Sequence, residues 1–207
     1  MRYRLALFAV ICGTCSAQAV HDETSLTIVL RGESVPNAVL AEMEREVDSA
    51  VTPSGIQLNW LVGSGGTEPD VPGQLVIIRM RGACRTGSRV DADPPEAGEP
   101  LAQTHVVNGR VLPIADVLCN AVRKLVDRDL RAAAPSRREE LFGRALGRVT
   151  AHELYHILLR TTDHGHEGLS RAMQSSAALL APRESFPPAD ERRIAESIGA
   201  DAESAGR

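Results

Sequence analysis

Aromatic residues are scarce in this 207-residue chain, at 3%, whereas hydrophobic residues of all kinds make up 43%. Any hydrophobic core must therefore consist mainly of Leu, Val, Ile and Ala side chains. Lysine is nearly absent, because Lys124 is the only one and arginine supplies the other basic residues. The formal net charge is −4, so we expect neither nucleic acid nor an anionic membrane surface as a partner.

Long hydrophobic runs are also missing. The apolar run over residues 5–12 is much shorter than the roughly 20 residues that a helix needs to cross a bilayer, and no later stretch approaches that length, so no stable membrane insertion is expected. Two arginines precede this run, and Ser16-Ala17-Gln18-Ala19 follows it, with small residues at the −3 and −1 positions of a cleavage after Ala19. This arrangement is typical of a secretory signal peptide. The sequence therefore predicts a signal peptide over 1–19, a single domain over 20–207, and a secreted or periplasmic location.

Cysteine occurs only four times. Cys12 and Cys15 lie in the predicted signal peptide, which leaves Cys84 and Cys119 as an even pair in an oxidising compartment. We expect these two to form a disulfide, which would close a loop of about 35 residues and stabilise the fold by roughly 4 kcal/mol. The alternative is a pair of unrelated buried thiols.

Hydrophobic periodicity predicts a single mixed α+β domain. Alternating or β-branched apolar residues predict strands over 25–30, 56–62 and 75–80, and a short edge strand over 104–112. Apolar residues at helical spacing predict helices over 36–51, 116–132, 136–158, 170–180 and 189–197. Residues 82–104 are rich in Gly, Pro and Asp and predict an exposed, mobile loop. The initial strand–helix–strand order predicts a crossover helix between two parallel strands.

The helix over 136–158 is the most informative element. Ser136 and Glu139 have the spacing of a capping box, which marks a helix start. Gly143, Gly147 and Ala151 recur every four residues and predict a small-residue ridge that packs closely against a sheet. Apolar residues on several faces indicate a central helix rather than a surface one.

This helix ends in the sequence His152-Glu153-Leu154-Tyr155-His156, an H-E-x-x-H motif. Residues four apart lie about 6 Å from each other on one face of a helix, so two imidazoles can bind one zinc ion. Glu153 then reaches a water on the zinc without being a ligand, and can act as the general base that takes its proton. The sequence predicts that His152 and His156 bind Zn²⁺ and that Glu153 is catalytic.

Catalytic zinc commonly has a third protein ligand. The candidates follow the motif closely, around the turn expected at Gly165: His164, His166, Asp163 and Glu167. Imidazole is the commoner zinc ligand, so His164 is the preferred choice and His166 the second. The acidic candidates could instead orient a ligand imidazole from behind.

The segment over 149–173 resembles the metzincin-type zinc metalloproteases, whose longer signature is H-E-x-x-H-x-x-G-x-x-H/D. Leu159 stands where that signature has glycine, and Thr162 where it has the third ligand. The segment is more similar to small secreted bacterial proteins whose third histidine comes later, and on that pattern His164 is the third ligand. Ser170 then replaces the methionine of a turn beneath the metal, unless Met173 takes that place, and Tyr155 replaces a small residue.

This resemblance implies a metzincin-like α+β fold, with a mixed sheet, a crossover helix, a central H-E-x-x-H helix and an edge strand that lines the substrate groove. It implies a secreted zinc-dependent peptidase that hydrolyses bonds in a peptide or protein substrate through a zinc-activated water. Two other hypotheses stay open: a secreted zinc-binding module without catalytic activity, and a disulfide-bonded structural protein without metal.

Overall fold

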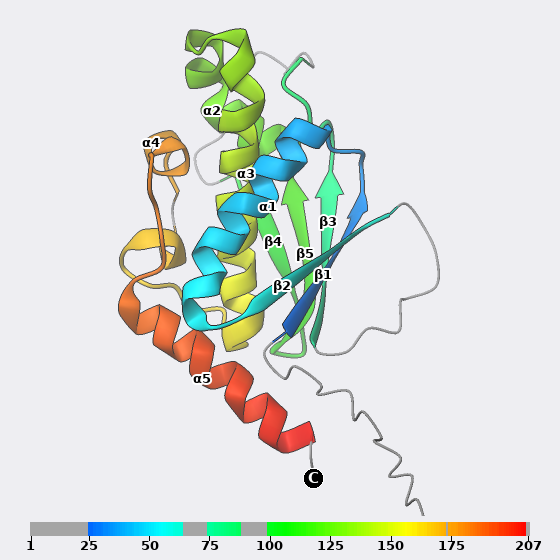
Figure 1. Ribbon diagram of the computed structural model, residues 1–207, viewed down its shortest axis with the longest axis vertical. Coiled ribbons are helices and arrows are strands. Elements are labelled where there is room, and N and C mark those ends of the chain that lie inside the picture. The colour runs from blue at the N-terminus through cyan, green and yellow to red at the C-terminus, as the bar shows by residue number, and fades with distance from the viewer. Residues whose placement is uncertain (1–24, 64–73, 88–98, 173, 206–207) are drawn as a thin grey trace, which may run out of the picture.

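The computed structural model describes residues 25–63, 74–87, 99–172 and 174–205 (Figure 1). The predicted signal peptide over 1–19 lies outside the described residues. So do residues 88–98, which form about half of the loop predicted over 82–104.

A five-stranded mixed sheet forms one layer of the fold, in the order β2-β1-β3-β5-β4. The strands are β1 (Ser25–Gly32), β2 (Gln57–Val62), β3 (Gln74–Arg81), β4 (Ala102–Val107) and β5 (Arg110–Leu118). The first four in this order are parallel to their neighbours, whereas β4 pairs antiparallel with β5 and forms an edge of the sheet. The predicted α+β class and the parallel pairing of the first two strands are confirmed. The helix that joins those strands is α1 (Asn37–Val51).

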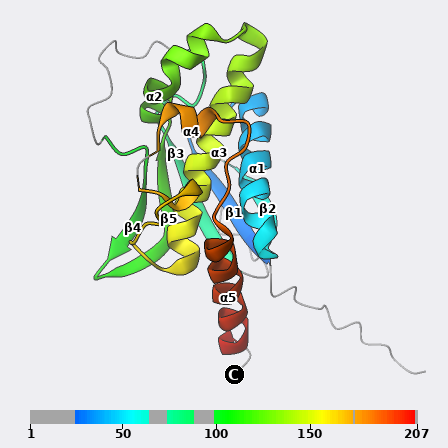
Figure 2. The same ribbon diagram turned by 90° about the vertical axis from the view of Figure 1, so that its left-hand side faces the viewer.

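Helices α1 and α3 (Pro135–Leu159) lie side by side over one face of the sheet (Figures 1 and 2). Alternate residues of the central strands point into this layer, because successive strand side chains face opposite ways. The buried core is aliphatic, as the composition predicts, and joins residues of three strands and the two helices: Leu26, Ile28, Ile78, Met80, Val117, Val39, Met43, Val47, Leu146 and Val149.

The predicted strand over 104–112 is two strands. The chain turns back at Asn108 and Gly109, both of which have positive φ, and β5 then continues to Leu118. The helix predicted to begin at 116 is α2 (Cys119–Ala132) and begins three residues later. The prediction was wrong because residues 116–118 fit both patterns. In the structure Ala115 and Val117 are fully buried under the helices, so strand alternation prevails.

Two details predicted for α3 are also wrong. Ser136 lies inside the helix, because Pro135 occupies its first turn and Ala134, the N-cap, makes no side-chain capping bond. The small-residue ridge packs against α1 instead of the sheet. A Cβ at Gly147 would lie 2.7 Å from the backbone oxygen of Met43, so only glycine permits this close approach of the two helices.

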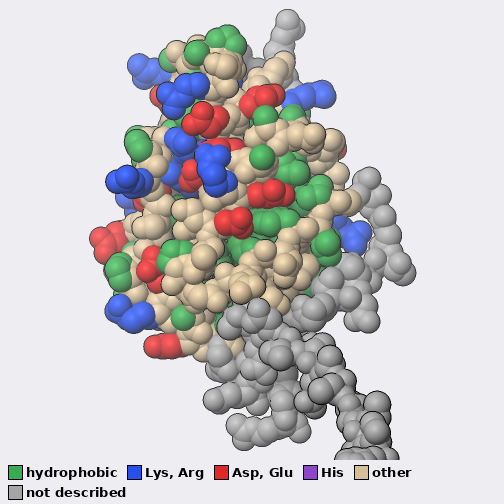
Figure 3. Space-filling model, in the orientation of Figure 1, with side chains coloured by type: hydrophobic (Ala, Val, Ile, Leu, Met, Phe, Trp, Pro, Cys, Tyr) green, Lys and Arg blue, Asp and Glu red, His purple; other side chains and the backbone are tan. Residues whose placement is uncertain are grey.

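Ion pairs reinforce the contact between α1 and α3. Acidic and basic side chains are interspersed over the helices on the face drawn in Figure 3. Arg148 is 1% exposed and donates from Nε to Glu46 Oε2 at 3.1 Å and from Nη1 to the carbonyl oxygen of Ala178 at 2.7 Å. Arg144 donates to the other oxygen of the same carboxylate at 3.2 Å. A charged network therefore joins α1, α3 and the segment around Ala178.

The C-terminal part of the chain is less helical near residue 170 than predicted. A 3₁₀ turn (Gly168–Ser170) and the short helix α4 (Ser176–Leu180) replace the single helix expected over 170–180. The last helix, α5 (Pro188–Ala205), is longer than the predicted 189–197 and extends beyond the end of α3 (Figure 2).

Cys84 and Cys119 lie at disulfide-bonding distance, with their Cα atoms 5.0 Å apart. The pair ties the loop after β3 to the first residue of α2. Among the described residues, none of the helices is long and apolar enough to cross a membrane.

Candidate metal centre

Three histidines converge beside the edge strand. The Nε2 atoms of His152 and His156 are 3.1 Å apart, and potential ligand atoms of His152, His156 and His164 all lie within 4.8 Å of one another. The ring centroid of His164 is 5.2 Å from that of His152 and 4.6 Å from that of His156. His152 and His156 are buried, whereas His164 is exposed. The structure therefore brings together three residues that can hold a metal ion.

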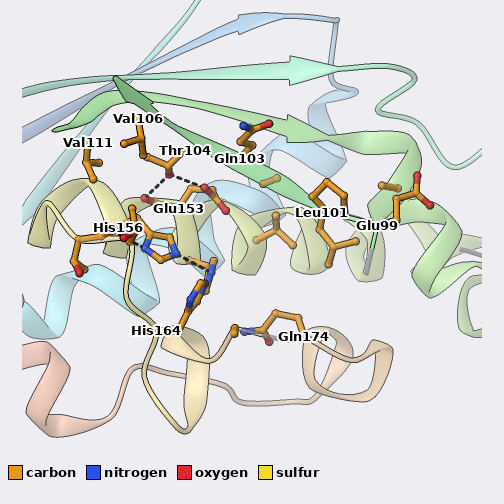
Figure 4. Close-up of a pocket in the computed structure, with 18 of the residues that line it drawn as sticks. Glu99, Leu101, Gln103, Thr104, Val106, Val111, Glu153, His156, His164 and Gln174 are labelled. Carbon is orange, nitrogen blue, oxygen red and sulfur yellow. Dashed lines mark hydrogen bonds between the residues drawn. The ribbon is translucent and has the colours of Figure 1, made fainter. Parts of the chain in front are cut away.

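The local backbone explains how His164 reaches the other two. Helix α3 places His152 and His156 one turn apart and ends at Arg160, which adopts the left-handed conformation with φ 49°. The Thr161 amide then donates to the carbonyl oxygen of His156, and this closes the helix. The chain reverses, and His164 returns over the open side of the two buried rings (Figure 4).

Backbone carbonyls fix the orientation of both buried rings. Nδ1 of His152 lies 2.6 Å from the carbonyl oxygen of Leu169, and Nδ1 of His156 lies 2.9 Å from that of Thr161. A carbonyl oxygen only accepts hydrogen bonds, so each Nδ1 carries the ring proton and each Nε2 presents a lone pair. This is the arrangement that metal-binding histidines usually show.

The two facing Nε2 atoms are placed so that they could share a cation. Burial lowers the pKa of His152 to about 4, and also lowers the pKa of His156. Both rings are therefore neutral near pH 7, and their lone pairs would repel each other at 3.1 Å. A metal ion bound by both nitrogens removes this repulsion, so the donor set fits a metal that prefers imidazole ligands.

Glu153 lies next to the histidines and is tied to the edge strand. Its Oε2 accepts a hydrogen bond of 2.6 Å from the hydroxyl of Thr104 on β4 (Figure 4). The side chain is buried, and this burial raises its pKa to about 7, although the Thr104 hydrogen bond acts in the opposite direction. Glu153 is not in the ligand group. Glu153 therefore lies beside the three histidines without belonging to their group.

The site opens into a cleft of about 610 Å³ between β4, α2 and α3. The histidines and Glu153 line one part of it, and Glu99 and Leu101 lie further along it (Figure 4). Beyond Glu153 the lining is largely apolar and includes Leu101, Leu125 and Val149. A ligand in this cleft would touch both the polar centre and an apolar wall.

A scan of protein-family models, a search of curated proteins and a search of solved structures each find no match to this chain.

The other candidate ligands do not join the group. His166, Asp163 and Glu167 are exposed, and the described residues that could hold a metal are only His152, His156 and His164. Met173, the alternative to a methionine at 170, lies outside the described residues.

Tyr155 is directed away from the cleft. It is 1% exposed, its ring stacks on Phe186 with centroids 5.9 Å apart, and its hydroxyl accepts a 3.3 Å hydrogen bond from Arg193 on α5. The Tyr155 side chain is thus packed against the C-terminal segment.

Sequence reasoning missed three groups that shape the site. The hydroxyl of Thr104 and the carbonyl oxygens of Thr161 and Leu169 each contact a residue of the H-E-x-x-H motif. Only Thr104 had a signal in the sequence, because it lies in the strand that was expected to line a groove. Backbone carbonyls have no sequence signature.

Proposed function

We propose that this chain is a secreted zinc-dependent peptidase with a metzincin-like fold. His152, His156 and His164 hold the zinc, and Glu153 is the general base for hydrolysis of a peptide bond. The observation that carries the proposal is the convergence of three imidazoles and a buried carboxylate in one cleft, beside an edge strand.

The donor set favours zinc with a catalytic rather than a structural role. Neutral imidazoles suit Zn²⁺, and three protein ligands leave a coordination position open, whereas structural zinc sites usually have four. His164 is exposed and lines the cleft, so the open side of the site is accessible to a substrate. When bound, zinc polarises a substrate carbonyl group and makes water a stronger acid.

The chain's own residues supply the proton transfers. Thr104 occupies Oε2 of Glu153, so we assign proton transfer to Oε1. Glu153 takes a proton from the attacking water at this atom and later gives it to the amine that leaves. The Thr104 hydroxyl fixes the plane of the carboxylate throughout.

The cleft suits an extended peptide. Strand β4 pairs only with β5 in the described sheet, so its outer edge has backbone groups available to pair with another strand. A substrate held there lies alongside Glu153, and the wall formed by Leu101, Leu125 and Val149 accepts an apolar side chain.

The test compares Glu153→Gln with the unaltered protein on a peptide library, with Glu196→Gln on the exposed side of α5 as a matched control. We expect cleavage by the unaltered protein and by the control, loss of cleavage with EDTA, and recovery with Zn²⁺. Glu153→Gln should bind one zinc and cleave nothing. Undiminished cleavage by Glu153→Gln would remove the proposed base. Full zinc loading without any cleavage by the unaltered protein would support the non-catalytic zinc-binding module.

The third ligand is tested separately by zinc stoichiometry. His164→Ala should hold much less zinc than the unaltered protein after dialysis, whereas His166→Ala should retain it, because only His164 joins the other two rings. The opposite pattern would assign the third ligand to His166.

A further inference from the structure

We propose that Asp190 on α5 positions the metal-binding residues through the hydroxyl of Ser170, and thereby sets the metal affinity of the site. The inference rests on the proposed metal centre but not on peptidase activity. On this inference α5 influences metal binding, although none of its residues is a metal ligand.

The hydrogen bond between the two side chains is short and buried. Ser170 Oγ lies 2.6 Å from Asp190 Oδ2, and the two residues are 0% and 7% exposed. Ser170 Oγ also lies 3.1 Å from the carbonyl oxygen of Glu167, so Asp190 is the closer of its two acceptors. Asp190 accepts in addition from Arg193 Nη1 at 3.0 Å. A hydrogen bond to a charged group in a buried place is among the stronger ones in proteins.

Ser170 is connected to two of the three proposed ligands. Its neighbour Leu169 supplies the carbonyl oxygen that receives Nδ1 of His152. The carbonyl oxygen of Ser170 itself accepts from the amide of Gly165 at 2.8 Å, and Gly165 directly follows His164. Movement of Ser170 would therefore displace the partner of one ligand and the backbone of another.

The surrounding packing leaves little freedom to compensate. A Cβ at Gly165 would clash with the Ser170 side chain, so the two segments are in close contact. The Leu169 amide donates to the carbonyl oxygen of Ser185 at 3.1 Å, which attaches the same turn to the chain just before α5.

Helix α5 also contacts α3 at a residue that lies between His152 and His156. Arg193 donates both to Asp190 and to the hydroxyl of Tyr155, which lies between His152 and His156 in the chain. Asp190 and Arg193 thus link the loop that carries His164 to the helix that carries the other two histidines. In the metzincin-like pattern a methionine is expected at position 170. Here Ser170 stands at that position and is hydrogen-bonded to Asp190.

The experiment is a double-mutant cycle on metal affinity. The affinity for Zn²⁺, and the visible absorption of the Co²⁺-loaded protein, are measured for the unaltered chain, Ser170→Ala, Asp190→Ala and the double variant. Residues that orient metal ligands typically change metal affinity by about 10- to 100-fold when removed. We expect each single variant to raise the Kd at least tenfold and to alter the Co²⁺ spectrum. The double variant should be little weaker than either single one, because both remove the same interaction.

Two further variants separate positioning from general stability. Asp190→Asn keeps an acceptor for Ser170 and should recover much of the affinity, whereas Glu196→Gln, an exposed change on the same helix, should leave it unchanged. Thermal unfolding of each metal-free variant shows whether it is folded. If Asp190→Ala does not fold, Ser170→Ala carries the test, because it removes one oxygen atom and leaves Asp190 paired with Arg193.

The outcomes distinguish this inference from the function on which it rests. Unchanged Kd and spectrum in folded Ser170→Ala would overturn it, whatever happens to the melting temperature. Independent, multiplicative effects of the two substitutions would also overturn it. If the unaltered chain binds neither Zn²⁺ nor Co²⁺, the metal centre and this inference both fail.

Discussion

The buried guanidinium of Arg148 provides a quantitative test of how α3 is held in place. Arg148 is 1% exposed and has two acceptors, Glu46 and the carbonyl oxygen of Ala178. Glu46 is 14% exposed and is also paired with Arg144. The two partners are therefore unequal. Removing Glu46 removes the carboxylate hydrogen-bonded to the buried guanidinium and leaves it only the coulombic attraction of Glu184, whereas removing Arg148 leaves a carboxylate that still pairs with Arg144.

The magnitudes follow from this asymmetry. Breaking a buried ion pair so that one charge stays unpaired costs about 3–5 kcal/mol of unfolding free energy, and we expect this loss for Glu46→Met. For Arg148→Met the main loss is the charged hydrogen bond to the Ala178 carbonyl oxygen, which still accepts from the Ala181 amide; a hydrogen bond to a charged group is worth about 1.5–3 kcal/mol. The double variant replaces the pair by apolar side chains, which is often neutral. It should be more stable than Glu46→Met alone.

The assay is urea unfolding at neutral pH with EDTA present, so that metal binding does not add to the measured stability. In a domain of this size the loss in Glu46→Met corresponds to a fall in Tm of roughly 6–20 °C. Arg192→Met, an exposed change on α5, is the control and should stay within about 0.5 kcal/mol of the unaltered protein. The reasoning is refuted if Arg148→Met costs more than Glu46→Met, or if the double variant is the least stable of the three.

Three other predictions follow from single contacts. Thr104→Val removes the hydroxyl that donates to Glu153 Oε2, and a hydrogen bond to a charged group is worth about 1.5–3 kcal/mol. We therefore expect kcat/KM to fall by roughly 10- to 150-fold while the zinc stoichiometry is unchanged. An unaffected kcat/KM would contradict the role of Thr104. Burial alone would raise the pKa of Asp116, but hydrogen bonds from neighbouring arginines and a histidine outweigh it and lower the pKa from 3.8 to about 2. Its stabilising contribution is therefore present above pH 3.8 and lost as the pH falls towards 2, and the stability difference between the unaltered protein and Asp116→Asn, measured by urea unfolding, should shrink over that window. Gly147→Val would place a branched side chain against the Met43 backbone and should cost about 1–3 kcal/mol in the same assay; an unchanged midpoint would show that the two helices can separate freely.

The sequence was sufficient for elements whose signal is local. The crossover helix and the first parallel strands follow from apolar periodicity, and the spacing of His152 and His156 places both rings on one face of a helix. Periodicity failed where two patterns coincide. Residues 116–118 continue both the strand before them and the helix after them, and only tertiary contacts decide between these states. Asp116 on β5 bonds Arg79 on β3 at 2.7 Å, and such a pairing between strands cannot be derived from either segment alone.

The capping and ridge predictions failed for a related reason. Each assigned a partner to a residue from its spacing, and spacing does not identify the partner. Ser136 has the right separation from Glu139, but Pro135, with its fixed φ, already begins the helix one residue earlier. Gly143 and Gly147 do permit close packing, but against α1, because α1 and α3 cover the sheet side by side.

The third ligand shows the same limit at the functional site. The sequence placed His164, His166, Asp163 and Glu167 within five residues, and every one of them has suitable ligand chemistry. Which one reaches the buried histidines depends on the path of the chain after Arg160. Along that path Gly165 bonds Ser170, and Ser170 in turn bonds Asp190, twenty residues further along the chain. A motif of five residues can therefore place two of the proposed ligands and the proposed base, and we propose that the position of His164 depends on the packing of the C-terminal helix. For this reason we expect the metal affinity of the centre to be sensitive to substitutions on α5 that touch no ligand.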